Sequence, residues 1–456
     1  MIMQKLVDFI VDIRHEDLPP LVVQESKRVL LDSIGVAIAG LAIDKGKYAV
    51  ELARRLGGPA ESTIVGVGDK VSCTSAAFAN GELINALDMD ALLIPSHVSP
   101  YVIPATLALA ESAGASGKDL IIANVLAHEL SARLGRAITS VGYATLYGLN
   151  LCVIGGAAGA GKVVKLDKEK MAHALGLACY MAPSPVSMRF SYALPPSMVK
   201  YAPAGSMAQA EILAVLLAEM GYTGDKGVFD GEHGFWEFMP QAQWDPQRLS
   251  DKLGDRWSFL ATHYKPYPCC RLMHSGLDGF IKIIEENNLH PEDIEQVKVF
   301  SNPGFDFPVF RNREITTSIG AQFSTAYPFA AAAYRVGLGN WQDTQTINDP
   351  KIIEFMGKVN FAPHPEFEAK FRENPRTDLS LVEVVAKGQT FRQETMFAKG
   401  THSPPQFRLS DDELVAKFRS NTSRALPQGK VDKAVESLLH LDEVPNVAEL
   451  MELVTI

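Results

Sequence analysis

The stretch NALDMDALLIPSHVSPYVIPATLA, residues 85–108, decides how the chain is interpreted. It places two aspartates and a histidine, Asp88, Asp90 and His97, between two segments with the apolar rhythm of helices. Its prolines argue against one continuous helix across residues 94–102, because proline lacks an N–H group and clashes with the preceding turn. We expect the acids and the imidazole on a break between two helices, facing a cavity. The alternative is a buried polar turn whose aspartates cap helix ends.

The composition is that of a soluble globular enzyme. The chain has 456 residues, of which 47% are hydrophobic and 21% charged, and its formal net charge is −10. This length predicts two domains. The absence of a block rich in Lys and Arg argues against nucleic-acid binding, and no apolar run approaches membrane-spanning length. An anionic substrate would have to be held by a few local cations against the overall negative charge.

The termini and the cysteines predict a cytoplasmic protein. The first twenty residues have the pattern of an amphipathic helix and not of a signal peptide. The odd, scattered set of five cysteines predicts reduced thiols. The adjacent Cys269 and Cys270 lack the further thiolates that an iron–sulfur cluster needs, so structural thiols are favoured over a cluster or a nucleophile.

The periodicity predicts a mainly α-helical fold with a second, smaller α+β part. Residues 1–265 show helical patterns with one short β-like piece at 62–72, which predicts a large all-α helical domain. Residues 266–400 add the strand alternation of EDIEQVKVFSNPG and a strand pair around Lys387-Gly388, with helices between them, which predicts an α+β domain. Helical patterns return in 401–456, and we expect them to pack on the large domain.

A second informative stretch is HYKPYPCCRLMHS, residues 263–275. It gathers three potential cations, Lys265, Arg271 and His274, in a segment rich in turn residues, which suits recognition of a polycarboxylate. The alternative is a solvated turn between domains. In PPSMVKYAPAG, Lys200 lies between apolar residues, so we expect partial burial and a shifted pKa.

One apparent nucleotide motif is better explained by packing. GGAAGAGKV, residues 155–163, contains G-x-x-x-x-G-K, but a phosphate-binding loop needs Ser or Thr next, and Val163 fills that position. The flanking residues have helical patterns, so the small residues predict close approach of helices.

These segments together resemble the MmgE/PrpD family over almost the whole chain. KPYPCCRLMH matches the distinctive string K-P-Y-P-C-C-R-x-x-H of that family. Residues 85–99 resemble its H-x-L-D-x-D-D and H-P-S segments, and Ser324 with Tyr327 resembles its F-S-x-x-Y. The family includes 2-methylcitrate dehydratase, cis-aconitate decarboxylase and iminodisuccinate epimerase. The resemblance implies a helical domain with an α+β lid domain, a homodimer, and chemistry on small polycarboxylates with no metal and no cofactor.

The resemblance also implies the site residues. The catalytic candidates are Asp88, His97, Lys200 and His274, and the substrate-binding candidates are Asp90, Lys265, Arg271 and Tyr327. We expect His97 and His274 to transfer protons and Lys200 to bind a carboxylate or to act as the second acid. Asp88 would orient an imidazole and set its tautomer.

The chain departs from the family pattern at four positions. Ala91 replaces the last acid of D-x-D-D, Leu92 replaces the Thr or Ser that often follows, and Val98 replaces the proline of H-P-S. Ala144 stands where many relatives have a histidine in G-F-H-x-T. These changes predict a less polar pocket, and therefore a substrate with fewer carboxylates or the simpler proton exchange of an epimerase.

The predicted function is that of a lyase acting next to a carboxylate, in the manner of a 2-methylcitrate dehydratase. Two alternatives are a cis-aconitate-type decarboxylase and an epimerase of an iminodisuccinate-type diacid. Two acid/base groups on opposite sides of the substrate suit all three reactions, so the sequence leaves them open. An alternative of another class is a non-catalytic scaffold that binds a polycarboxylate.

Overall fold

The turn that carries Asp88 and Asp90 separates two buried helices in the computed structural model of this chain. These are α4 (Cys73–Asn85) and α5 (Ser99–Ser112). The model describes residues 1–456 except 94–96, 140–147, 184–186, 232, 239–242 and 375–376. The second helix begins before the point that the prolines suggested: Pro100 lies in its first turn, where no N–H is needed, and Pro104 lies inside it.

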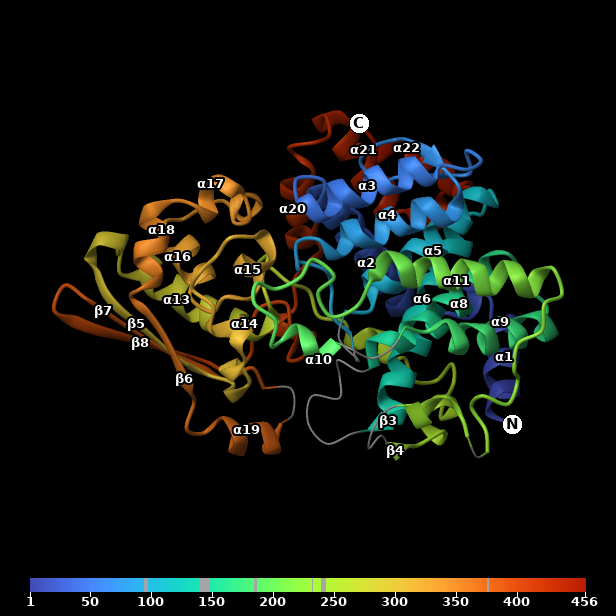
Figure 1. Cartoon of the computed structure of the whole chain (residues 1–456), viewed down its shortest axis with the longest axis horizontal. Helices are drawn as coiled ribbons and strands as arrows, with labels where there is room; N and C mark the ends of the chain where they lie inside the picture. Colours follow the sequence, from blue (N-terminus) through green and yellow to red (C-terminus); the bar gives the residue numbers. More distant parts are fainter. Residues whose placement is uncertain (94–96, 140–147, 184–186, 232, 239–242, 375–376) are drawn as a thin grey trace.

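Two more buried helices complete the core of the helical part (Figure 1). The helices α6 (Gly117–Ala137) and α8 (Cys152–Val163) pack closely against each other. A Cβ atom on Gly155 would lie 2.0 Å from the Ser131 Oγ atom, so only glycine fits there. The stretch 155–163 is therefore helix, and Lys162 donates to the carbonyls of Val11 and Ile13 at 2.7 Å each. The prediction that these small residues serve helix packing is confirmed.

Further helices surround this core. They are α1 (Ile2–Asp12), α2 (Pro20–Gly40), α3 (Asp44–Leu56), α9 (Lys168–Met181), α10 (Ser187–Phe190), α11 (Ala204–Glu219) and α12 (Gln247–Ser250). The helical part is not entirely α, because it holds two small antiparallel strand pairs. These are β1 (Ser62–Thr63) with β2 (Lys70–Val71) and β3 (Ile138–Thr139) with β4 (Gln243–Trp244). None of the helices formed by the described residues has the length and apolar character to cross a bilayer.

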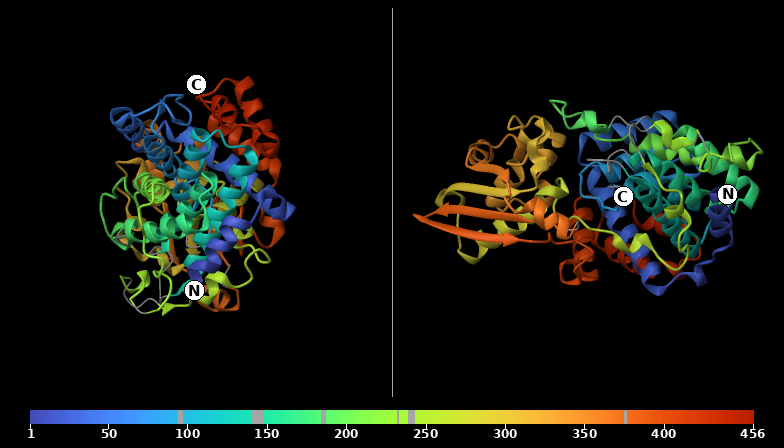
Figure 2. Two further views of the ribbon diagram at one scale, coloured as in Figure 1. Left: turned by 90° about the vertical axis from the view of Figure 1, so that its right-hand side faces the viewer. Right: turned by 90° about the horizontal axis from the view of Figure 1, so that it is seen from below.

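A four-stranded mixed sheet lies at the other end of the molecule (Figures 1 and 2). Its strand order is β6 (Val359–Pro363), β5 (Ile294–Ser301), β7 (Ser380–Ala386), β8 (Gln389–Thr395), with β5 and β6 parallel and the other pairs antiparallel. Lys387 and Gly388 join β7 to β8 with φ of 52° and 69°, which is the backbone of a type I′ hairpin turn. The predicted strand pair is confirmed.

Helices cover one face of this sheet. The helix α13 (His274–Glu286) packs on β7 and β8, and α16 (Tyr327–Ala333) and α18 (Pro350–Met356) pack beside it. The shorter helices at this end are α14 (Pro308–Arg311), α15 (Ser318–Phe323), α17 (Thr344–Ile347) and α19 (Phe367–Glu373).

The last segment of the chain returns to the helical end. The helices α20 (Asp411–Thr422) and α21 (Gln428–Leu439) pack on α2, and α22 (Val447–Leu453) packs on α5. Lys417 in α20 donates to the Asp32 carboxylate at 2.6 Å and to the Met89 carbonyl at 2.8 Å. The N- and C-termini therefore both lie at the helical end (Figure 1).

Two buried glutamines join the sheet end to the turn after α4. The Gln322 amide donates to the Ala86 carbonyl at 2.7 Å. The Gln342 amide donates to the carbonyls of Leu87 at 2.8 Å and Pro268 at 2.9 Å. The turn that leads into Asp88 is thus fixed by side chains from a distant part of the sequence.

Candidate active site

Asp88 is the centre of a buried network of charged side chains. It is fully buried, and its φ of 56° places it in the left-handed region, which aspartate tolerates better than most residues. Its carboxylate accepts from the Lys200 ammonium at 3.1 Å, from the Lys265 ammonium at 2.7 Å and from the Tyr201 hydroxyl. Lys200 has a φ of 55°, so two residues of the network have the uncommon backbone that gathers at functional sites.

A backbone bridge brings Lys265 to Asp88. Leu92 and His263 exchange two backbone hydrogen bonds of 2.8 Å each, which aligns the segment after Asp88 with the segment before Lys265. The Lys265 ammonium also donates to the Asp88 carbonyl at 2.9 Å. Side chains far apart in sequence, those of Asp88, Lys200 and Lys265, therefore meet at one point.

Burial and pairing set the charges of the three groups. Burial lowers the pKa of Lys200 to about 8, although Asp88 opposes this shift. Burial would also lower the pKa of Lys265, but the Asp88 and Asp90 carboxylates outweigh it and hold that pKa above its ordinary value. Burial would raise the pKa of Asp88, but Lys200 and Lys265 hold it well below its usual range, so Asp88 is ionised.

His97 lies between Asp90 and Tyr201. Its Nδ1 atom is 2.7 Å from the Asp90 carboxylate, and its Nε2 atom is 2.8 Å from the Tyr201 hydroxyl oxygen. The His97 and Tyr201 rings stack with centroids 4.8 Å apart. Sequence reasoning gave the imidazole partner as Asp88. The structure gives this contact to Asp90, because Asp88 is already occupied by the two lysines.

The partners of His97 suit donation from its ring nitrogens. The hydroxyl of Tyr201 donates to Asp88, so its oxygen is free to accept from His97 Nε2. His97 Nδ1 faces the Asp90 carboxylate, which is an acceptor. At the centre of the network, the ammonium groups of Lys200 and Lys265 share the one carboxylate of Asp88, which leaves an excess of positive charge at that point.

His274 is a neutral imidazole with one nitrogen that carries no proton. It is buried, and its Nε2 atom lies 3.2 Å from the Cys269 carbonyl, so Nε2 must donate. Burial, with the positive charges of Arg271 and Lys265, holds the pKa of His274 well below its ordinary value, so the ring is neutral. Nδ1 then has a bare lone pair, and it has no hydrogen-bond partner among the described residues. Among the described residues, His274 makes no hydrogen bond with the Asp88 network, but it presents a base that lies near enough to Lys265 for the charge of that lysine to lower its pKa.

Two predicted substrate-binding residues are held by other parts of the protein. The Arg271 guanidinium donates to the carbonyls of Ala398 at 3.1 Å and Lys399 at 2.7 Å, and to the Thr401 hydroxyl at 2.6 Å. The Tyr327 hydroxyl donates to the Trp341 carbonyl. The structure does not bring either side chain into the Asp88 network. Ala144 lies outside the described residues.

The donor atoms do not suit a metal ion or a nucleophilic thiol. One ligand atom from each of Asp88, Asp90 and His97 lies within 4.8 Å of the others. A divalent cation would have to displace the ammonium groups of Lys200 and Lys265 from Asp88, and the imidazole ring of His97 from Asp90. These residues therefore suit chemistry without a metal. Burial raises the pKa of Cys270 to about 12 and that of Cys269 well above its ordinary value, so neither is a thiolate.

Family models match both parts of the chain. The model described as the MmgE/PrpD N-terminal domain matches residues 4–247, and the model described as the MmgE/PrpD C-terminal domain matches residues 267–441. The chain belongs to the MmgE/PrpD family. The resemblance that the sequence motifs indicated is confirmed.

Curated MmgE/PrpD relatives are similar over nearly their whole length. The cis-aconitate decarboxylase-like protein oryM of Aspergillus oryzae is 24% identical and covers 99% of this chain and 96% of its own. A cis-aconitate decarboxylase of Aspergillus terreus is 25% identical, covering 96% and 92%. The human cis-aconitate decarboxylase is 26% identical, covering 95% and 90%. These are names of enzymes with lyase-type activity, so this family member is an enzyme, as predicted.

The sequence analysis missed Tyr201. A tyrosine directly after Lys200 was visible in KYAP, but nothing in the local pattern shows that its hydroxyl would join Asp88 to His97. The partners lie 113 and 104 residues away, so only the fold reveals the contact. Asp90 was taken for a substrate-binding residue, whereas its carboxylate holds His97.

Proposed function

We propose that this protein is a lyase that decarboxylates a small polycarboxylate of the cis-aconitate class. The observation that carries the proposal is the buried network around Asp88, in which the ammonium groups of Lys200 and Lys265 share one carboxylate in a chain whose formal net charge is −10. A buried positive charge attracts a polyanionic substrate and stabilises the carbanion that forms when carbon dioxide leaves. The names of the curated relatives favour decarboxylation over the 2-methylcitrate dehydratase reaction.

The lysines have donors left for the substrate. An ammonium group has three N–H donors. Lys200 uses two of them on the Asn85 carbonyl and Asp88, and Lys265 uses two on the Asp88 carbonyl and carboxylate. One N–H of each lysine therefore remains to bind a substrate carboxylate.

The two histidines supply the proton chemistry. In decarboxylation of cis-aconitate, the bond to one carboxylate breaks, carbon dioxide leaves, and its electron pair moves through the double bond to the far carbon, which takes up a proton. The trianion and one proton thus give a dianion and carbon dioxide. His97, which lies between Asp90 and Tyr201, is the proton donor. A reaction that began with removal of a proton from the substrate, as in an epimerase or a dehydratase, would use the unprotonated Nδ1 atom of His274 as its base.

The proposed function goes with a division of the chain into two domains. We propose a helical domain of residues 1–265 and 401–456 and an α+β lid domain of residues 266–400, in a cytoplasmic homodimer. The glutamines Gln322 and Gln342, which reach from the sheet end to the turn before Asp88, support a lid that fixes the site.

The test is proton NMR of the enzyme in D₂O with cis-aconitate, 2-methylcitrate, citrate and an iminodisuccinate-type diacid. The proposal expects cis-aconitate to lose carbon dioxide and the product to gain one deuterium. Gain or loss of water would indicate a hydro-lyase. Exchange of deuterium without loss of either would indicate an epimerase, and binding without any reaction would indicate a scaffold. Each of these three results would contradict the proposal.

A matched pair of lysine variants separates the loss of a catalytic contact from a general loss of stability. Lys200→Gln should lower turnover by about 10²–10³, because it removes a charge-stabilising donor. Lys162→Gln removes another partly buried lysine, which donates to the backbone carbonyls of Val11 and Ile13 and to no member of the Asp88 network. It should leave turnover unchanged.

A further inference from the structure

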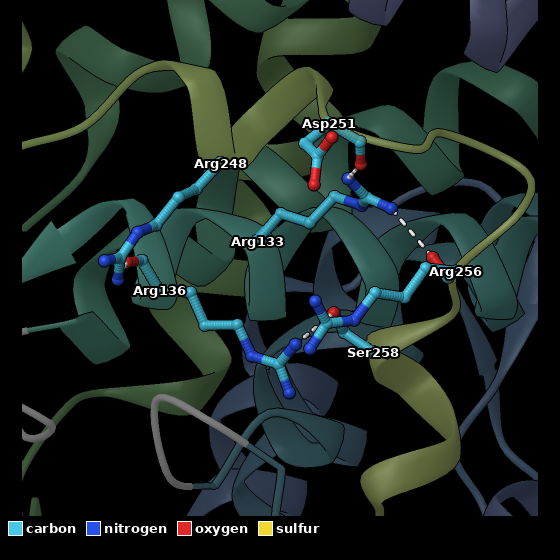
Figure 3. A pocket seen from close by; sticks show the side chains of 6 residues that line it. All are labelled: Arg133, Arg136, Arg248, Asp251, Arg256 and Ser258. Atoms are coloured by element: carbon cyan, nitrogen blue, oxygen red, sulfur yellow. Dashed lines mark hydrogen bonds between the residues drawn. The ribbon is translucent and has the colours of Figure 1, made fainter.

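A pocket lined by four arginines lies in the helical part of the molecule (Figure 3). It has a volume of about 370 Å³ and shares no residue with the Asp88 network. Its lining residues are Arg133, Arg136, Arg248, Asp251, Arg256 and Ser258. The lining has four guanidinium groups and one carboxylate, and the neighbouring Glu129 and Asp245 pair with two of the four in a chain whose formal net charge is −10.

Arg133 forms the framework of this pocket. Its guanidinium donates to the Glu129 carboxylate at 2.6 Å. Its other donors go to backbone carbonyls of α12 and of the loop that follows it, namely those of Leu249, Asp251, Lys252 and Arg256. All five of its N–H groups are thereby used. Arg133 therefore fixes the loop that carries the other lining residues and is not available to a ligand.

Arg256 and Arg136 are the groups that can receive a ligand. Arg136 donates to the buried Ser258 hydroxyl at 2.9 Å, and Arg256 lines the same pocket (Figure 3). Arg256 is exposed and has no side-chain hydrogen bond or ion pair with any described residue. Arg248 stands across the pocket and donates to the Asp245 carboxylate at 3.0 Å. An anion in the pocket would be attracted by the guanidinium groups that line it.

We propose that this pocket binds a small, multiply charged oxyanion at a site separate from the active site. Guanidinium groups match the geometry of phosphate and carboxylate oxygens, which they bind through two parallel hydrogen bonds. A volume of about 370 Å³ suits a small metabolite. The ligand class is an oxyanion with two or more charges, either a phosphate compound or a polycarboxylate. Arg136 and Arg256 bind it and the Ser258 hydroxyl completes the site.

The test is calorimetric titration of the full chain with inorganic pyrophosphate and, separately, with citrate, at ionic strength fixed with sodium chloride. We expect one of the two anions to bind at a site whose affinity falls about tenfold or more in Arg256→Gln and in Arg136→Gln, because each variant removes a charge-assisted contact. Pyrophosphate as the stronger ligand would indicate a phosphate compound, and citrate a polycarboxylate.

A charge-matched control completes the experiment. Arg372→Gln removes one positive charge from an exposed arginine on α19, which pairs with Glu368 at 3.3 Å. It should leave the affinity unchanged. The proposal is overturned if neither anion binds above the chloride background, or if the affinity is the same in Arg256→Gln, Arg136→Gln and the wild type. Citrate bound only at the active site would give this second result.

Discussion

At the scale of single residues, Tyr201 joins the two halves of the charged network. Its hydroxyl donates to Asp88 and accepts from His97, so it links the imidazole ring to the carboxylate that the two lysines share. Tyr201→Phe keeps the ring stacked on His97 but removes this link. We expect kcat to fall by about 10²-fold with a smaller change in KM, because the proton donor loses its position. Steady-state kinetics measure both.

The control for this variant is Tyr334→Phe, which removes a phenol hydroxyl at the sheet end, outside the network. It should keep wild-type kinetics. Equal kcat values for Tyr201→Phe and the wild type would show that the Tyr201 contact has no part in the reaction.

Lys200 predicts a pH dependence of activity. Burial favours the neutral amine and lowers the pKa of Lys200 to about 8, so the cationic form is lost as pH rises through that value. We expect kcat/KM to fall about tenfold per pH unit above this point. Lys200→Arg should remove this limb, because arginine stays charged throughout the range. A profile that stays flat up to pH 10 in the wild type would contradict the assignment.

Local sequence patterns predicted several site residues but not their partners. Asp88, His97, Lys200 and Lys265 stand in recognisable motifs, and the structure brings them together. Arg271 stands in such a motif too, but it donates to the carbonyls of Ala398 and Lys399 and to the Thr401 hydroxyl. A motif shows that an arginine is present, whereas its partner depends on contacts over more than a hundred residues, which no local pattern contains.

At the scale of elements, Glu211 is an unpaired carboxyl group between α11 and α8. Neither of its oxygens has a hydrogen-bond partner among the described residues, and a Cβ atom on Gly156 would lie 2.2 Å from them. Burial raises the pKa of Glu211 well above its ordinary value. Since the folded pKa exceeds the unfolded one, the folded state retains a proton that the unfolded state releases. Stability is therefore lost as pH rises above about 4.3.

We expect Glu211→Met to stabilise the protein by about 1–3 kcal/mol at neutral pH, because an apolar side chain of similar size removes the buried unpaired group. The gain should shrink as pH falls through about 4.3 and below, because the carboxyl then becomes protonated in the unfolded state as well. Thermal unfolding across this pH range measures it. Glu219→Met, at the exposed end of α11, serves as the control, and an equal change in both variants would contradict this account.

The elements themselves were predicted where local chemistry determines them. The hairpin around Lys387 and Gly388 follows from turn residues that accept positive φ. The strand β6 was missed, because it pairs in parallel with β5 through a long connection and has no turn signal of its own. The start of α5 was placed too late, because Pro100 was taken for a helix breaker when it lies in the first turn.

At the scale of the whole molecule, the active-site turn depends on contacts between the two ends. Gln342→Ala leaves the carbonyls of Leu87 and Pro268 without their donor. Each buried unpaired carbonyl costs about 1–3 kcal/mol, so the melting temperature should fall. Turnover should fall with it, because the turn before Asp88 loses its support. Gln389→Ala, at an exposed position of β8, is the control. Unchanged turnover in Gln342→Ala would show that the sheet end does not position Asp88.

The central claim is that the buried network of charged side chains around Asp88 decarboxylates a cis-aconitate-type polycarboxylate. The most direct measurement is release of carbon dioxide from cis-aconitate by the wild type and by Lys265→Gln, with near-UV circular dichroism to show that both are folded. We expect rapid release by the wild type and release at least about 10²-fold slower by folded Lys265→Gln. No release by the wild type, or equal release by both proteins, would contradict the claim.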